Sequence, residues 1–195
     1  ANLASARLFG VPSVVAVNRF PGDTERELET VRAAAVRLGA RAACVSEVFE
    51  KGGEGGEDLA RAVIEACGEA PSFRFLYPPE ASIEEKIAAV ATRVYGAAAV
   101  EYSETAQKKI GLYASRGWGK FPVCMAKTQL SLSHDPAWKG APKGFTLPVR
   151  DVIASAGAGF LTPLCGDIML MPGLPSLPAL MRIDLDEGGN VVGLT

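Results

Sequence analysis

Blocks of apolar and polar residues alternate over the first third of the chain, and they predict a strand–helix–strand–helix order. The nearly continuous apolar run from Val11 to Asn18 is typical of a strand buried on both faces of a parallel sheet. Thr24 and Glu27 have the spacing of a capping box, which predicts that a helix begins there. This order favours an α/β fold with an open, mostly parallel, Rossmann-like sheet and flanking helices. The predicted strands are 11–18 and 40–46, the predicted helices are 24–39 and 57–67, and 47–56 is a predicted loop.

The remainder of the chain is expected to form a second, smaller α+β unit. A linker is predicted at 68–72, which divides the chain into an α/β unit at 1–70 and a C-terminal unit at 71–195. Ser82 and Glu85 repeat the capping-box spacing ahead of a second set of apolar positions at helical intervals. The predicted strands are 73–77, 97–102, 122–130 and 145–154, and the predicted helices are 82–96 and 104–116.

Composition narrows the class of protein. The 195 residues are 48% hydrophobic and 22% charged, which is typical of a folded globular chain. Twenty Lys and Arg residues are interleaved with 22 Asp and Glu residues, so no basic stripe suggests a nucleic-acid partner. No apolar run approaches the roughly 18 to 20 residues that span a bilayer, and no secretory signal is visible. We therefore expect a cytoplasmic protein that binds neither nucleic acid nor a membrane.

General catalytic and metal-binding motifs do not occur in this sequence. It contains no GxSxG, HExxH or GxxxxGK string, so no catalytic residue is assigned. The one histidine, His134, would need partners that the sequence does not reveal in order to act as a base. No CxxC pair is present, which argues against a metal site and favours buried structural thiols. The four cysteines are Cys44, Cys67, Cys124 and Cys165.

Two aromatic residues follow the predicted strands of the first unit. Phe20 with Pro21, and Phe49, come just after the carboxyl ends of consecutive strands, where open α/β sheets bind ligands. Two phenyl rings there would sandwich a heteroaromatic ring, and the alternative is that they fold back into the core. The glycine-rich segment 51–56 has two interpretations as well: backbone amides that approach a ligand or phosphate, or a flexible loop.

Five strings in this sequence resemble the C-terminal third of the formate–tetrahydrofolate ligase family. They are long, unusual in composition and in the family's order, and together they cover practically the whole chain. The strings are Val15–Thr24, Ser46–Gly56, Pro122–Gln129, Ser155–Phe160 and Gly166–Pro175.

The resemblance implies an ATP-dependent ligase that formylates tetrahydrofolate at N10 through formyl phosphate. In the family, the phosphate loop, the magnesium and monovalent-cation sites and the formate-binding residues belong to the N-terminal portion. We therefore expect a folate-side fragment that is inactive alone, truncated at its N-terminus and ending at the family's C-terminus. The alternative is a non-catalytic folate- or nucleotide-binding or assembly module. The intact enzyme is expected to be a homotetramer that binds tetrahydrofolate, formate and ATP.

The resemblance also assigns roles to the two aromatic positions. Phe20 with Pro21 matches the family's N-x-F-P segment, whose phenyl ring packs against the pterin. Phe49 stands where the family's string has the tryptophan that stacks on the other side. The replacement keeps a flat face but loses area and the indole donor, so weaker stacking is expected.

Five polar residues complete the predicted site. Asn18, Glu47 and Lys51 flank the same edge and are candidates for orienting pterin or nucleotide groups, although capping or solvated roles would also suit Glu47 and Lys51. Lys127 and Gln129, in the Pro122–Gln129 string, are expected to be buried polar residues that support the cleft.

Overall fold

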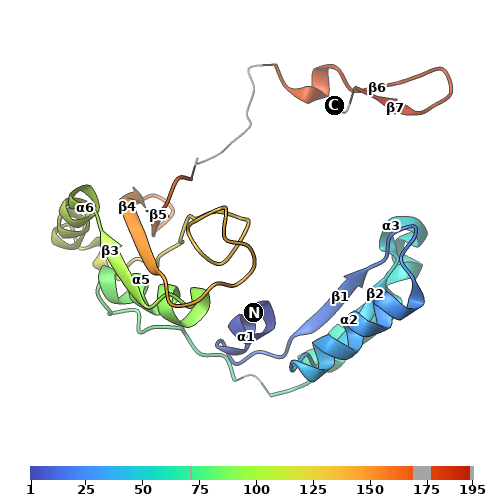
Figure 1. Cartoon of the computed structure of the whole chain (residues 1–195), viewed down its shortest axis with the longest axis horizontal. Coiled ribbons are helices and arrows are strands. Elements are labelled where there is room, and N and C mark those ends of the chain that lie inside the picture. The colour runs from blue at the N-terminus through green and yellow to red at the C-terminus, as the bar shows by residue number, and fades with distance from the viewer. Residues whose placement is uncertain (71, 169–176, 194–195) are drawn as a thin grey trace.

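The computed structural model describes residues 1–70, 72–168 and 177–193. Most of the string at 166–175 therefore lies outside the described residues. Figure 1 shows two groups of elements, one formed by residues 14–67 and the other by residues 83–165. The short helix α1 (Asn2–Arg7) lies between them.

The first unit has the predicted strand–helix–strand–helix order. Its elements are β1 (Val14–Asn18), α2 (Glu25–Arg37), β2 (Ala42–Ser46) and α4 (Glu57–Cys67). The strands pair in parallel and both helices pack on them. The predicted capping box of α2 is confirmed, because Glu27 N–H donates to Thr24 Oγ1 at 3.3 Å and Thr24 N–H donates to the Glu27 carboxylate at 2.9 Å. The core is small and consists mainly of Ala35, Ala40 and Ala43.

The central unit contains the main hydrophobic core. Its elements are α5 (Ile83–Val90), a π turn (Ala91–Tyr95), β3 (Ala99–Tyr102), α6 (Glu104–Ser115), β4 (Thr146–Ser155) and β5 (Phe160–Cys165). The sheet order is β3-β4-β5, with β3 parallel and β5 antiparallel to β4. The second predicted capping box, between Ser82 and Glu85, is confirmed as well. Leu147 and Val149 of β4 are buried at alternate positions, and Val152 is buried after a register shift between Val149 and Asp151.

Three predictions of local structure are wrong. Residues 73–77 form no strand, because this segment bonds instead to the end of α1, where Arg74 N–H donates to Phe9 O at 3.0 Å. Residues 122–130 form only isolated parallel bridges to β5, and the chain turns after Ala126. The predicted loop at 47–56 contains the short helix α3 (Val48–Lys51) and a 3-10 turn at Gly52–Gly56.

The described residues therefore form a mixed α/β structure with small parallel and mixed sheets. A two-stranded hairpin of β6 (Asp184–Leu185) and β7 (Val191–Val192) follows the central unit in the sequence. Cys165 is buried as predicted, whereas Cys67 and Cys124 are exposed. Within the described ranges, no helix is both long and apolar enough to cross a membrane.

Candidate functional site

The carboxyl ends of β1 and β2 lie side by side. In the parallel register, Asn18 at the end of β1 is opposite Ser46 at the end of β2. The segment that carries Phe20 therefore leaves the sheet beside the segment that carries Phe49. The sequence predicted this common edge, and the register confirms it.

The Phe20 segment is a tight turn. Phe20 N–H donates to Asp23 Oδ2 at 2.8 Å, and Asp23 N–H donates back to Phe20 O at 3.1 Å. Gly22 has a φ of 99°, which glycine adopts without strain. With the turn closed in this way, the Phe20 side chain is 61% exposed and Pro21 is exposed beside it. The Phe20 ring is therefore not part of the core.

Phe49 lies on the four-residue helix α3 and is 92% exposed. The 3-10 turn that follows α3 folds back onto the start of the helix, where Glu47 N–H donates to Gly55 O at 3.0 Å. A Cβ atom at Gly55 would lie 2.5 Å from the carbonyl carbon and oxygen of Glu47, so only glycine fits. This packing explains one glycine of the glycine-rich string without a ligand.

An ion-pair network links the two segments through Glu47. Lys51 Nζ lies 2.7 Å from Glu47 Oε2, Arg19 Nη1 lies 3.5 Å from Glu47 Oε1, and Arg19 Nη2 lies 2.5 Å from Glu25 Oε1. The Lys51 hydrogen bond is the main cause of a lowered Glu47 pKa, with the charges of Lys51 and Arg19 adding to it and desolvation opposing it. The Glu47 carboxylate is thus held in its charged form.

A polar hollow of about 450 Å³ lies beside this network. Its lining contains both acidic and basic side chains, which suits the hydrogen-bonding edge of a polar heterocycle. Sequence reasoning named Glu47 and Lys51 but missed the other charged residues. Arg19 lies inside the predicted Asn18–Phe20 segment and Glu54 inside the glycine-rich segment 51–56. The other missed residues carry no local signal, because they converge only through the fold. The missed lining residues are Arg19, Glu25, Arg32, Glu54, Glu57 and Asp58.

Lys127 and Gln129 line a different hollow, of about 420 Å³, together with Ala1 and Asn2. Lys127 Nζ donates to Thr128 O at 2.9 Å and lies 5.1 Å from the centroid of the Tyr95 ring. Burial is the main cause of a lowered Lys127 pKa. Gln129 is exposed rather than buried. The structure does not bring these two residues to the polar hollow beside α3.

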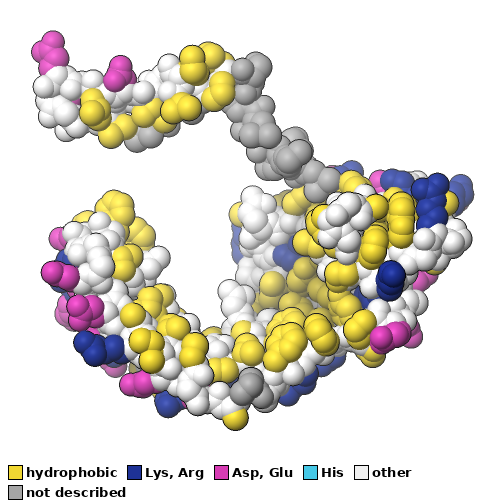
Figure 2. Space-filling view, turned by 180° about the vertical axis from the view of Figure 1, so that it is seen from behind, with side chains coloured by type: hydrophobic (Ala, Val, Ile, Leu, Met, Phe, Trp, Pro, Cys, Tyr) yellow, Lys and Arg dark blue, Asp and Glu magenta, His cyan; other side chains and the backbone are white. Residues whose placement is uncertain are grey.

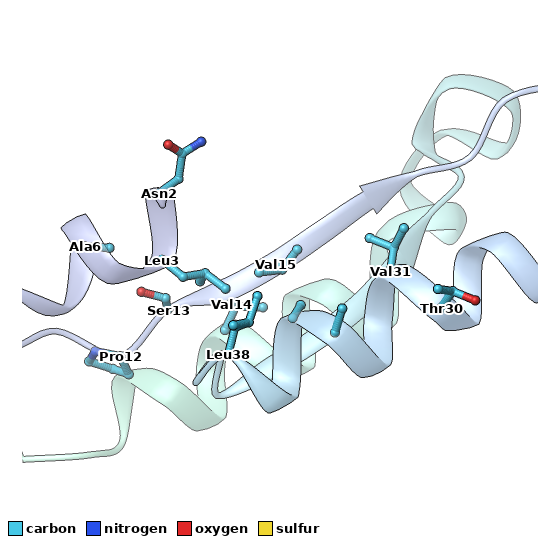
Figure 3. A pocket seen from close by; sticks show the side chains of 12 residues that line it. Asn2, Leu3, Ala6, Pro12, Ser13, Val14, Val15, Thr30, Val31 and Leu38 are labelled. Atoms are coloured by element: carbon cyan, nitrogen blue, oxygen red, sulfur yellow. The ribbon is translucent and has the colours of Figure 1, made fainter. Parts of the chain in front are cut away.

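An apolar groove of about 800 Å³ lies on another side of the first unit. It is formed by α1, β1 and α2, and the side chains of Leu3, Val15 and Leu38 point toward one another across it (Figure 3). Val31 and Leu38 of the lining are also exposed to solvent. Sequence reasoning did not predict this groove.

The family resemblance raises the question of cations. Among residues 1–70, 72–168 and 177–193, no three His, Cys, Asp or Glu side chains lie close enough together to hold a metal ion.

Comparison with known proteins agrees with the family resemblance of the five sequence strings. The chain is 51% identical over 193 residues to the formate–tetrahydrofolate ligase of Herpetosiphon aurantiacus, an alignment that covers 99% of this chain and 34% of that protein. The ligase of Roseiflexus castenholzii is 52% identical over 199 residues, which cover all of this chain and 35% of the relative. The mitochondrial C-1-tetrahydrofolate synthase of Saccharomyces cerevisiae is 45% identical over 98% of this chain and 20% of the relative.

This chain thus spans about a third of the length of the bacterial relatives. The family model described as formate–tetrahydrofolate ligase matches residues 1–195. Since the match extends over every residue, the chain belongs to the formate–tetrahydrofolate ligase family.

Proposed function

We propose that this chain carries the tetrahydrofolate-binding face of a formate–tetrahydrofolate ligase, with the pterin ring held between Phe20 and Phe49. The observation that carries the proposal is the exposure of both phenyl rings, on neighbouring segments at the carboxyl edge of two parallel strands. An exposed ring costs free energy in water, and each would gain about 0.5 to 1.5 kcal/mol from stacking beyond the area that it buries. Pro21 extends the apolar face next to Phe20.

The polar hollow supports the same assignment. A pterin has a flat ring with hydrogen-bond donors and acceptors along its edge, and the hollow presents both kinds of partner. Lys51 lies two residues from Phe49 along α3, and Asn18 lies two residues before Phe20. We assign to Asn18, Glu47 and Lys51 the orientation of the pterin or of nucleotide groups, and we assign no part in this site to Lys127 and Gln129, which line a different hollow.

The complete ligase would join formate to N10 of tetrahydrofolate at the expense of ATP, through formyl phosphate. The residues of this chain would bind and orient the folate, and none is proposed to act on the phosphoryl group, because the sequence contains no phosphate-loop string. The isolated chain would then bind folate without turning over. We further propose that 1–70 is part of a larger Rossmann-like sheet and that 71–195 is a separate C-terminal unit.

A role in assembly is the second candidate, and the apolar groove favours it. Exposed apolar patches of this kind mark sites of protein association. A module whose main task is assembly would keep the groove and would not depend on Phe20 or Phe49. The two candidates therefore respond differently to the same substitutions.

Calorimetric titration of the chain with tetrahydrofolate tests the proposal. Phe20→Ala and Phe49→Ala should each weaken binding by about 10-fold, since a buried aromatic face is lost in each case. Phe73→Ala is the matched control, because Phe73 is 56% exposed, close to the 61% of Phe20, but pairs with Phe75 outside the site. Unchanged affinity in both site variants would overturn the pterin sandwich and leave the assembly role.

A further inference from the structure

We infer that Glu47 is a positioning residue, which holds the helix that carries Phe49 against the turn that carries Phe20. The inference rests on the proposed function and adds a structural device to it. Glu47 would act through its two neighbours rather than by touching the pterin.

Each carboxylate oxygen of Glu47 is used by a different segment. Oε2 accepts from Lys51 Nζ at 2.7 Å, and Lys51 is the last residue of α3. Oε1 faces Arg19 Nη1 at 3.5 Å, and Arg19 directly precedes Phe20. The Glu47 side chain is only 24% exposed, so water screens these pairs less than it does a fully exposed pair. One side chain therefore connects residues that lie within two positions of each ring.

The backbone of Glu47 is fixed as well. Its carbonyl accepts from Glu50 N–H at 3.0 Å and from Lys51 N–H at 2.9 Å, and its N–H donates to Gly55 O. A Cβ atom at Gly55 would collide with the Glu47 carbonyl, so the two backbone segments are closely apposed. Movement of Glu47 would thus move α3 with it.

The helix α3 needs such an anchor. Four residues are far too few for a helix to be stable alone, because the entropic cost of nucleation exceeds the free energy gained from the hydrogen bonds of one turn. Arg19 is itself fixed by Glu25 in the first turn of α2. The connection therefore runs from the main helix of the unit, through Arg19 and Glu47, to α3.

Loss of the Glu47 charge should change the position of Phe49 more than it changes global stability. Ion pairs near the surface contribute little to unfolding free energy, whereas the order of a single-turn helix depends on its few anchors. Glu47→Gln keeps the size of the side chain and removes its charge. Asp151→Asn is the matched control, because it removes an ion pair of the same length and similar exposure, Lys109 to Asp151 at 2.7 Å, between α6 and β4 of the central unit.

The experiment combines hydrogen exchange with titration of tetrahydrofolate on the full chain. Glu47→Gln should speed amide exchange in 48–56 and weaken tetrahydrofolate binding by about fivefold, with an unchanged melting temperature. Asp151→Asn should leave both quantities as in the unsubstituted chain. In a double-mutant cycle, Arg19→Gln should add little to Glu47→Gln, because both remove the same connection.

The outcomes separate this inference from the proposed function. If the unsubstituted chain does not bind tetrahydrofolate, the proposed function fails, while the exchange data still test whether Glu47 anchors α3. Exchange in 48–56 that is the same in Glu47→Gln as in the unsubstituted chain would overturn the inference. Faster exchange with unchanged affinity would overturn it too, since the anchor would then have no effect on the ligand.

Discussion

The two units of this chain bury their strands to very different extents. In the central unit, the inward residues of β4 and β5 are closed off by α5 and α6 around one large core cluster. In the first unit, β1 has an apolar sequence, yet its residues are only partly buried or exposed. On the face shown in Figure 2, hydrophobic side chains remain at the surface of both units.

The difference shows that apolar composition is not sufficient for burial. A parallel strand is normally covered on both faces and flanked by further strands. In the described residues, β1 pairs with β2 alone, and the groove under α1 and α2 stays open. The core of the central unit is instead covered by residues that precede α6 in the sequence together with residues that follow it. The site proposed for folate thus lies on the unit whose strands are less buried.

The largest expected effect is on stability. Leu161 of β5 has an exposed fraction of 0%, and Leu161→Ala should lower the free energy of unfolding by about 2 to 5 kcal/mol because it leaves a cavity. Leu38 at the end of α2 is 58% exposed, and Leu38→Ala should change that free energy by less than about 0.5 kcal/mol. Urea denaturation followed by circular dichroism measures both. Equal losses would show that the groove is covered in solution.

The next effect is on self-association. We expect the chain to associate through its apolar groove, and Leu38→Lys should weaken the association by about 10-fold or more, because one leucine face is lost. A lysine at this helix end is also compatible with the helix dipole. Sedimentation at several concentrations gives the dissociation constant, with Leu112→Lys on the exposed face of α6 as the control. A chain that stays monomeric at all concentrations would contradict this expectation.

The smallest effect is a local response to acid. The lowered pKa of Glu47 means that its contribution to folding is present above the ordinary glutamate value of 4.5 and is lost as pH falls through the lower folded value. The charges that face it are Arg19 and Lys51, with Glu25 and Glu50 next to Arg19.

Hydrogen exchange at decreasing pH should therefore show loss of protection in α3 before loss in β4 and β5, after correction for intrinsic rates. The central strands are protected by apolar burial, which does not titrate. Simultaneous loss in both units would contradict the contrast between them. Glu47→Gln should remove the early step and leave the later one in place.

The fold was predictable where its causes are local. Both capping boxes, at Thr24 with Glu27 and at Ser82 with Glu85, lie within four residues and formed as expected. The strand predictions at 73–77 and 122–130 were wrong, because a strand needs a partner. The local pattern cannot show that a partner is absent, or that pairing is limited to isolated bridges.

In the candidate site as well, only the features with local causes were predictable. The positions of Phe20 and Phe49 after two strands were predictable from the order of elements, but their exposure was not, since a phenyl ring suits a core equally well. Arg19 and Glu25 were missed because their pairing depends on how the turn at 19–23 directs the chain into α2.

The sequence by itself determined the helices α2, α4, α5 and α6, the first two strands and the family, because capping, periodicity and long characteristic strings are properties of neighbouring residues. Only the tertiary structure decided that both phenyl rings face solvent, that Glu47 connects the two ring-bearing segments, and that a groove remains open beside β1. These features depend on contacts between residues distant in the chain, and the free energy of such contacts is set by the packing of the whole unit.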